Sequence, residues 1–298
     1  MKRRGEFYIV SAYLLWGFLP IYWKVIKSIN APQIICHRIF WSFLLLFSVL
    51  FFIKKNRNFR KIFSRKNILI YAAGSLILAS NWTIYVWAVN SNLIVETSLG
   101  YFINPLLNVL MGVILLKEKL KSMQWLAIGL AATGVLYLTF IYGSFPWISL
   151  VLAFSFGLYG LIHKLGPLEA IEGLFLETGL LFVPVTALLM LFEARGTGAI
   201  GHVNFTQTLF LVFTGAATAV PLVLFNAGLR LIPLSVTGIL QYIAPSLQFL
   251  VGVVIYKEPF TWSRFTGFVF VWTALIIFTT CSIREYRKSN NHKPPLKK

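Results

Sequence analysis

The chain repeats itself at a constant offset of 140 residues, and this repeat limits the folds open to it. Gly17, for example, matches Gly157. Segments 101–113 and 241–253 align without a gap, and Ile103, Pro105, Leu107, Leu110, Gly112 and Val113 recur as Ile243, Pro245, Leu247, Leu250, Gly252 and Val253. Two halves built alike, each with an odd number of membrane spans, must lie upside down relative to one another. That framework is typical of secondary transporters.

Long apolar segments place most of the chain in a membrane. The chain is 58% hydrophobic with a mean hydropathy of +0.77, and a span needs about 20 apolar residues. We predict an all-α integral membrane protein of ten helices, with a first five-helix repeat in residues 1–145 and a second, with a basic tail, in 146–298. The predicted spans are 6–26, 34–53, 68–88, 93–116, 123–141, 146–163, 170–192, 207–229, 232–256 and 265–282.

The net charge of +18 belongs to the membrane topology rather than to a nucleic-acid site. With ten spans, most Lys and Arg residues fall on one side, including those of loop 54–67 and of the C-terminal tail. This is the positive-inside pattern, and it predicts two cytoplasmic termini. The basic loop is expected to touch anionic lipid head groups of the bilayer.

Catalytic and cofactor motifs are missing from the sequence. All nine acidic residues are glutamates, and no phosphate-binding G-x-x-x-x-G-K-[ST] loop occurs. The four histidines are scattered, which does not predict a metal site. We expect no cofactor, no metal and no enzymatic activity.

A polar stripe occupies the same place in both halves. Tyr101, Asn104 and Asn108 share one helical face of span 93–116, and Gln241 and Gln248 stand at the positions that match Tyr101 and Asn108. Polar residues in a span usually face a cavity or another helix. We predict that these five residues line a central substrate cavity; the alternative is hydrogen bonding between helices without substrate contact.

Span 68–88 carries three further candidates for the cavity. Asn81 and Tyr85 are one turn apart and could face the same interior, so we include both as substrate-binding residues. Trp82 is included with them, although tryptophans in spans are more often interfacial anchors or packing residues.

Pro105 and Pro245 form a matched pair near the middle of corresponding spans. Proline removes a helical hydrogen bond and kinks a helix. Interrupted helices at corresponding places in two halves point to a midplane binding site and to gating bends. We predict a gating role, while noting that membrane helices tolerate single prolines.

Four ionisable residues in the spans are candidates for ion coupling: His37, Arg38, Glu96 and Glu177. Glu177 lies about two turns into its span, where a buried carboxyl group suits a proton carrier, and His37 stands at the matching position. Arg38 either snorkels towards the surface or attracts anions at the outer mouth. Glu96 either stabilises a helix N-terminus or has a functional role.

The segments His37-Arg-Ile-Phe-Trp-Ser, Asn81-Trp-Thr-Ile-Tyr-Val-Trp-Ala-Val-Asn, Glu96-Thr-Ser-Leu-Gly-Tyr-Phe-Ile-Asn-Pro-Leu and Gln241-Tyr-Ile-Ala-Pro-Ser resemble the RarD proteins. These belong to the EamA branch of the drug/metabolite transporter superfamily. The resemblance extends over essentially the whole chain. It implies a bacterial inner-membrane permease with two EamA repeats around a central cavity, and the RarD name is associated with chloramphenicol sensitivity.

These observations together predict a secondary transporter of a small metabolite, amino acid or drug-like solute, working by alternating access and able to couple to protons. An uncharged or zwitterionic solute suits a cavity of amides and aromatic rings. The alternative is a membrane enzyme acting on a lipid-linked substrate, which normally needs clustered His, Asp or Glu residues. Because one chain contains both repeats, we expect a monomer, with a dimer not excluded.

Overall fold

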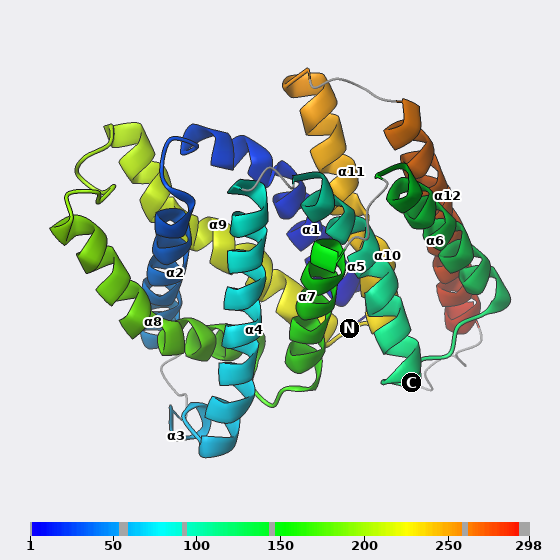
Figure 1. Ribbon diagram of the computed structural model, residues 1–298. Helices are drawn as coiled ribbons and strands as arrows, with labels where there is room; N and C mark the ends of the chain where they lie inside the picture. Colours follow the sequence, from blue (N-terminus) through cyan, green and yellow to red (C-terminus); the bar gives the residue numbers. More distant parts are fainter. Residues whose placement is uncertain (1, 54–58, 91–93, 143–146, 258–261, 292–298) are drawn as a thin grey trace.

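The computed structural model describes residues 2–53, 59–90, 94–142, 147–257 and 262–291, and the regular secondary structure in these segments is helical (Figure 1). Helices suit an apolar chain in lipid because they satisfy every backbone hydrogen bond within the segment. The elements are α1 (Lys2–Val25), α2 (Ala31–Ile53), α3 (Phe59–Ile62), α4 (Arg65–Asn90), α5 (Ile94–Ile114), α6 (Ser122–Tyr142), α7 (Trp147–Leu165), α8 (Ala170–Ala194), α9 (Phe205–Leu229), α10 (Leu234–Gln241), α11 (Ile243–Leu250), a π-helical turn η1 (Val251–Ile255) and α12 (Trp262–Asn291).

Each of the ten segments predicted as spans is largely helical. Seven helices among the described residues are long and apolar enough to cross a membrane, when α10, α11 and η1 are taken together as Leu234–Ile255. Two further apolar stretches, Gly100–Ile114 and Phe265–Cys281, are shorter. The fold is therefore a multi-pass helical bundle, and the number of ten spans stays a prediction.

Two boundaries differ from the predicted ones. The span predicted over 232–256 is divided at Tyr242, where α10 ends and α11 begins. Pro245 has no N–H to donate to the carbonyl of Gln241, so the helix lacks a hydrogen bond at this point. Helix α12 continues nine residues past the predicted end at residue 282, to Asn291, because Arg, Lys and Glu are good helix formers once the chain has left the hydrocarbon.

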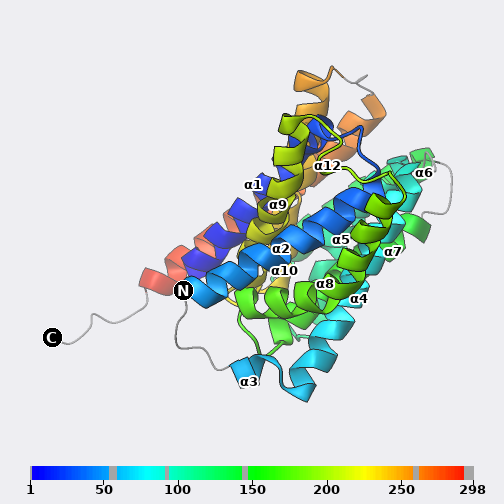
Figure 2. The same cartoon turned by 90° about the vertical axis from the view of Figure 1, so that its left-hand side faces the viewer.

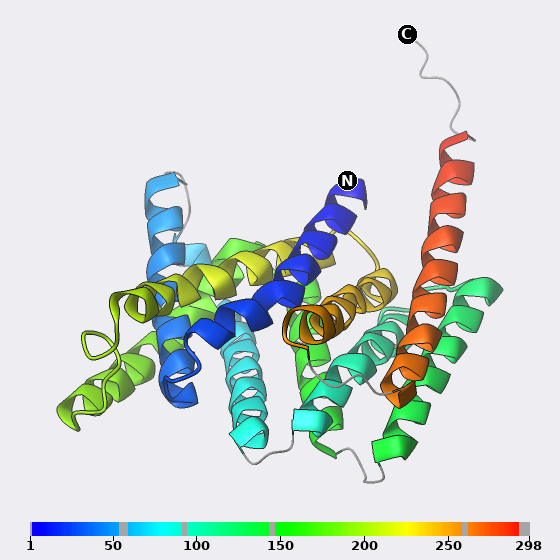
Figure 3. The ribbon, with the colours of Figure 1, turned by 90° about the horizontal axis from the view of Figure 1, so that it is seen from above.

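Helices at corresponding places in the two halves pack against one another. Helix α2 lies on α8, α5 on α10, and α6 on α12. Helix α1 of the first half lies on α9 of the second, and the corresponding pair, α7 and α4, is also in contact. Seen from above, α6 and α12 form one edge of the molecule, and α2, α8 and α9 form the opposite edge (Figure 3).

The paired helices α2 and α8 run in opposite directions. Phe40 stacks on Phe182 with 5.2 Å between ring centroids, and further along α2 Phe47 faces Phe175, which precedes Phe182 in α8. Figure 2 shows α2 and α8 side by side on the face of the bundle turned towards the viewer.

Glycines allow α6 and α12 to approach closely. A Cβ atom at Gly134 would lie 2.9 Å from the Cβ of Phe270, and one at Gly267 would lie 2.6 Å from the Cγ of Leu138. Small residues at such crossings are typical of membrane helices, whose association depends on close van der Waals packing. The order of these contacts along the two helices again makes the pair antiparallel.

Two apolar clusters surround the polar groups described below. One joins α5, α6, α10 and α12 around Phe102, Val109, Ala131, Tyr242 and Phe278. The other joins α2, α4, α7, α8 and α9 and includes Leu78, Tyr159, Phe175 and Leu222. The buried polar side chains therefore lie at helix crossings inside the bundle.

Candidate functional site

Three of the predicted substrate-binding residues meet at the crossing of α5 and α10. Asn108 donates from Nδ2 to Oε1 of Gln241 at 2.8 Å and to Oδ1 of Asn104 at 3.0 Å. Asn104 donates to the carbonyl of Ala153 on α7 at 2.5 Å. All three amides are buried. They link three helices, and Oδ1 of Asn108 accepts no hydrogen bond from the described residues.

Gln248 and Asn81 lie elsewhere in the bundle, and each binds a neighbouring helix. Gln248 donates to the carbonyl of Trp16 on α1 at 3.1 Å. Asn81 donates to the carbonyl of Leu152 and to the hydroxyl of Ser155, both on α7. The polar stripe predicted on one face is therefore distributed over several crossings.

Tyr85 and Tyr101 come together and are more open. Their rings lie edge to face with 6.3 Å between centroids. Tyr85 is 36% exposed and Tyr101 39% exposed. Helices α4 and α5 thus place two partly exposed phenol side chains next to each other, apart from the buried amides.

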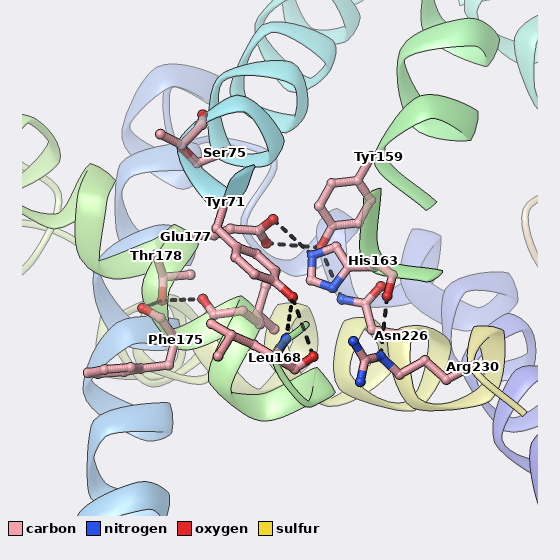
Figure 4. A network of polar contacts seen from close by, with 12 residues as sticks. Tyr71, Ser75, Tyr159, His163, Leu168, Phe175, Glu177, Thr178, Asn226 and Arg230 are labelled. Atoms are coloured by element: carbon pink, nitrogen blue, oxygen red, sulfur yellow. Dashed lines mark hydrogen bonds and ion pairs between the residues drawn. The ribbon is translucent and has the colours of Figure 1, made fainter. Parts of the chain in front are cut away.

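Glu177 of α8 is the centre of a buried polar network that joins α7, α8 and α9 (Figure 4). Its Oε1 lies 2.8 Å from Nε2 of His163, and its Oε2 accepts a hydrogen bond from the hydroxyl of Tyr159 at 3.2 Å. Asn226 then donates to the oxygen of Tyr159 at 3.1 Å. All four side chains are at most 2% exposed.

Glycines on two helices permit this packing. A Cβ atom at Gly74 of α4 would lie 2.4 Å from Oε1 of Glu177, and one at Gly173 would meet Tyr71 and His163. The hydroxyl of Tyr71 donates to the carbonyl of Leu168 at 3.3 Å. Figure 4 shows Glu177 between Tyr71 and His163, with Arg230 on the far side of His163.

A small cavity adjoins Glu177 between α2, α4, α8 and α9. Its volume of about 10 Å³ is room for about one water molecule. Glu177, Ser42, Ser75, Thr178 and Thr218 line it together with Trp82 and the apolar residues Ile39, Leu78, Leu174, Leu181 and Leu222, and the surface that they turn towards the cavity is apolar.

Arg38 of α2 reaches the same region from another direction. Its Nε donates to the hydroxyl of Thr218 at 2.9 Å, and Thr218 also lines the cavity. Its guanidinium carbon lies 4.4 Å from the ring centroid of Trp82 and 5.0 Å from that of Trp23. Trp82, which sequence analysis placed among the substrate-binding residues, is therefore a cation–π partner of Arg38.

The remaining candidates have different surroundings. His37 is buried, and its Nδ1 has no hydrogen-bond partner in the described part of the chain. The ion-pair partner of Glu177 is His163 rather than the matching His37. Pro105 lies inside α5, which continues through it as a single helix, whereas Pro245 lies just after the break at Tyr242. Glu96 is in the first turn of α5, and its side chain is outside the described set.

Sequence analysis missed His163, Tyr159 and Asn226. The signal was present, because Tyr159 and His163 are four residues apart on one face of an apolar helix. What the sequence lacked was the direction in which Glu177 points. Within the described residues, no three His, Cys, Asp or Glu side chains come together as a metal site would need.

Comparison with known proteins agrees with the helical bundle. A sequence profile of the EamA-like transporter family matches residues 3–140. "Uncharacterized transporter YojE" of Bacillus subtilis is 40% identical over 97% of this chain and 98% of its own length. "Protein RarD" of Streptomyces exfoliatus is 39% identical over 97% and 92%, and "Protein RarD" of Escherichia coli K12 is 38% identical over 97% and 98%.

A solved structure, described only as a crystal structure of a protein, has the same fold. It superimposes with a TM-score of 0.73 over 94% of this chain and 99% of its own, at 16% sequence identity. The similarity of the full-length relatives is much higher and covers both halves. The chain belongs to the EamA-like transporter family and is a relative of the RarD proteins.

Proposed function

We propose that the protein is a secondary transporter that moves a small solute across a bacterial inner membrane by alternating access between two inverted five-helix repeats. The observation that carries this proposal is the pairing of matching helices across the two halves, α2 with α8, α5 with α10 and α6 with α12. The names of the relatives, transporters and RarD proteins of bacteria, support the same activity.

The direction of the fourth helix in each repeat supports inversion. Glu118, just past the end of α5, accepts hydrogen bonds from the backbone N–H groups of Leu234 and Ser235 at the start of α10. The end of α5 therefore lies beside the start of α10. The end of η1 corresponds to the end of α5 in the second repeat, and it lies about 30 Å from the start of α10 at 1.5 Å per residue. Figure 1 accordingly has the ends of α5 and η1 at opposite ends of the bundle.

Both repeats end their fourth helix with the same backbone conformation. Lys117 has a φ of 54° and Lys257 a φ of 51°, the left-handed region that non-glycine residues rarely adopt. The next position, Glu118, caps α10, while Glu258 lies outside the described residues. This recurrence supports descent of the two halves from one duplicated unit.

An even number of spans accounts for the position of the chain ends. The start of α1 and the end of α12 lie on one side of the bundle in all three ribbon views (Figures 1, 2 and 3). With the basic loop and tail at the cytoplasmic face, both termini of the chain lie inside the cell.

We assign proton coupling to the pair of Glu177 and His163. One proton shared between these groups can be retained or released as the two repeats move, and a neutral pair costs less to move through lipid than a charged one. The groups that face the pair are Tyr71 of α4, Tyr159 of α7 and Asn226 of α9, with Arg230 behind His163.

Alternating access then requires one region to open to each side in turn. The break at Tyr242 before Pro245 is the place where the second repeat can bend, and Pro105 stands at the matching position. The hydrogen-bonded amides of Asn104, Asn108 and Gln241 lie near Pro105 and near the break at Tyr242. We propose that their contacts change as the two repeats move, which exposes the substrate-binding residues.

The test is solute flux in proteoliposomes with and without an imposed proton gradient. The substrate is first found by comparing metabolites of overexpressing cells with those of cells that lack the protein. Glu177→Gln should remove acceleration by the gradient while leaving exchange of substrate across the membrane. Glu193→Gln is the matched control, because Glu193 forms an exposed pair with His202 at 2.9 Å.

Two outcomes would contradict the proposal. Equal acceleration in Glu177→Gln and the unmodified protein would exclude this pair as the proton carrier. Labelling that places a tag after residue 116 and a tag after residue 256 on the same side of the membrane would exclude the inverted repeat, and with it the alternating-access mechanism.

A further inference from the structure

Arg38 carries a positive charge inside the bundle, and the described residues place no negative charge against it. It lies in the second turn of α2, and its hydrogen bond goes to the neutral hydroxyl of Thr218. In the described part of the chain, no carboxylate forms an ion pair with it. A charged side chain in a span is costly and is normally paired with an opposite charge or placed at a functional pathway.

The geometry leaves one edge of the guanidinium for a ligand. Trp82 and Trp23 lie near the guanidinium carbon, and Thr218 takes Nε. The two terminal NH₂ groups make no hydrogen bond with the described residues. Together they form a fork whose spacing matches the two oxygens of a carboxylate.

The surroundings of that edge are aromatic. Tyr22, Tyr85 and Tyr101 are close enough to the guanidinium to interact with it electrostatically. The side chains of Tyr85 and Tyr101 are each more than one third exposed. Aromatic faces and one cation together suit a small apolar body with a single negative charge.

We propose that Arg38 is the anchor for a carboxylate group of the transported solute, with Trp82, Tyr85 and Tyr101 around the rest of the molecule. A monoanion balances the charge of Arg38, whereas a phosphate dianion would leave a negative charge with no cation in this site. The solute class is therefore a monocarboxylate or a zwitterion such as an amino acid. This inference rests on the proposed transport function and adds the chemical class of its substrate.

The test compares charged and uncharged forms of the same small molecule on purified protein. Phenylacetate and N-acetylleucine are titrated beside their amides and inorganic phosphate, with binding measured by calorimetry. Both carboxylates should bind at least about 30-fold more tightly than their amides, as expected for loss of one partner of a desolvated charge pair. Phosphate should bind more weakly than either carboxylate.

Variants then locate the binding to Arg38. Arg38→Gln should reduce affinity for the carboxylates by at least about 30-fold, and Arg38→Lys should retain part of it because the charge remains but the fork is lost. Arg195→Gln, which removes an exposed arginine, should leave affinity unchanged. The carboxylate-to-amide comparison uses unmodified protein, so it holds even where Arg38→Gln does not fold.

Each result separates this inference from transport itself. Three results would overturn the assignment of Arg38 and leave transport standing. They are saturable flux without any preference for carboxylates, failure of all the carboxylates to bind, and binding of phosphate as tight as that of the carboxylates. Carboxylate binding that depends on Arg38 in a protein without flux would support the anion site and overturn the proposed function.

Discussion

The crossing of α2 and α9 positions Arg38 beside Thr218, and Gly215 controls how closely these helices approach. An added Cβ atom at Gly215 would lie 2.5 Å from the backbone carbon of Trp41 and 2.7 Å from its oxygen. The residue after Trp41, Ser42, donates to the carbonyl of Gly215 at 3.1 Å. We predict that Gly215→Ala separates α2 from α9 and destabilises the protein.

The expected size of the effect follows from these distances. Ordinary van der Waals contact begins at 3.4 Å, so the new methyl group must gain about 0.9 Å. The obstructing atoms belong to a helix backbone, so they move only with all of α2. Such overpacking costs about 1–3 kcal/mol, while replacing glycine by alanine within a helix gains about 0.5–1 kcal/mol. We expect a net loss of up to about 2.5 kcal/mol.

Gly129 provides the matched control. It lies in the interior of α6, and a Cβ atom there would meet nothing within 4 Å. Gly129→Ala should therefore gain about 0.5–1 kcal/mol from helix propensity alone. Both variants gain the same helix propensity, so they should differ by the overpacking cost of about 1–3 kcal/mol, which corresponds to about 2–6 °C in thermal midpoint at about 2 °C per kcal/mol.

Thermal unfolding in one detergent, followed by circular dichroism, measures both variants. Carboxylate affinity should also fall in Gly215→Ala, because Thr218 moves away from Arg38. Equal midpoints for the two variants would refute the close crossing of α2 and α9 and the placement of Arg38 that depends on it.

Three further predictions concern stability in the same unfolding assay. Glu118→Ala removes both side-chain acceptors at the start of α10 and should cost about 1–2 kcal/mol; the exposed Lys119→Ala should change stability by less than about 0.5 kcal/mol, and equal effects would contradict the cap. His163→Leu leaves the carboxylate of Glu177 without its buried partner and should cost about 3–5 kcal/mol. Adding Glu177→Leu to this variant should restore part of the lost stability. A double variant whose loss equals the sum of the two single losses would exclude coupling. Lys164→Met removes the donor to two carbonyls at the end of α9 and should cost about 1–3 kcal/mol, with faster amide exchange confined to that end, and unchanged exchange would show that the bond is unimportant.

The sequence was sufficient for the helical segments and the family. Runs of apolar residues about 20 long predict helices in lipid regardless of what they pack against. The matched positions 140 residues apart predicted two similar halves, and the helix pairs α2–α8, α5–α10 and α6–α12 follow that correspondence. The missing N–H of proline predicted an interruption at both matched prolines; the helix is interrupted next to Pro245, whereas α5 continues through Pro105.

Partner choice inside the bundle was decided by tertiary structure. Matching positions in the two halves predicted both His37 and Glu177 as coupling candidates, but they could not show that α7 presents His163 to Glu177 beside the glycines of α4 and α8. Likewise, the spacing of residues on α2 could not show that Trp82 and Thr218 would meet Arg38. Periodicity specifies which face of a helix a residue occupies, whereas the rotation and crossing of helices distant in sequence determine which side chain that face meets.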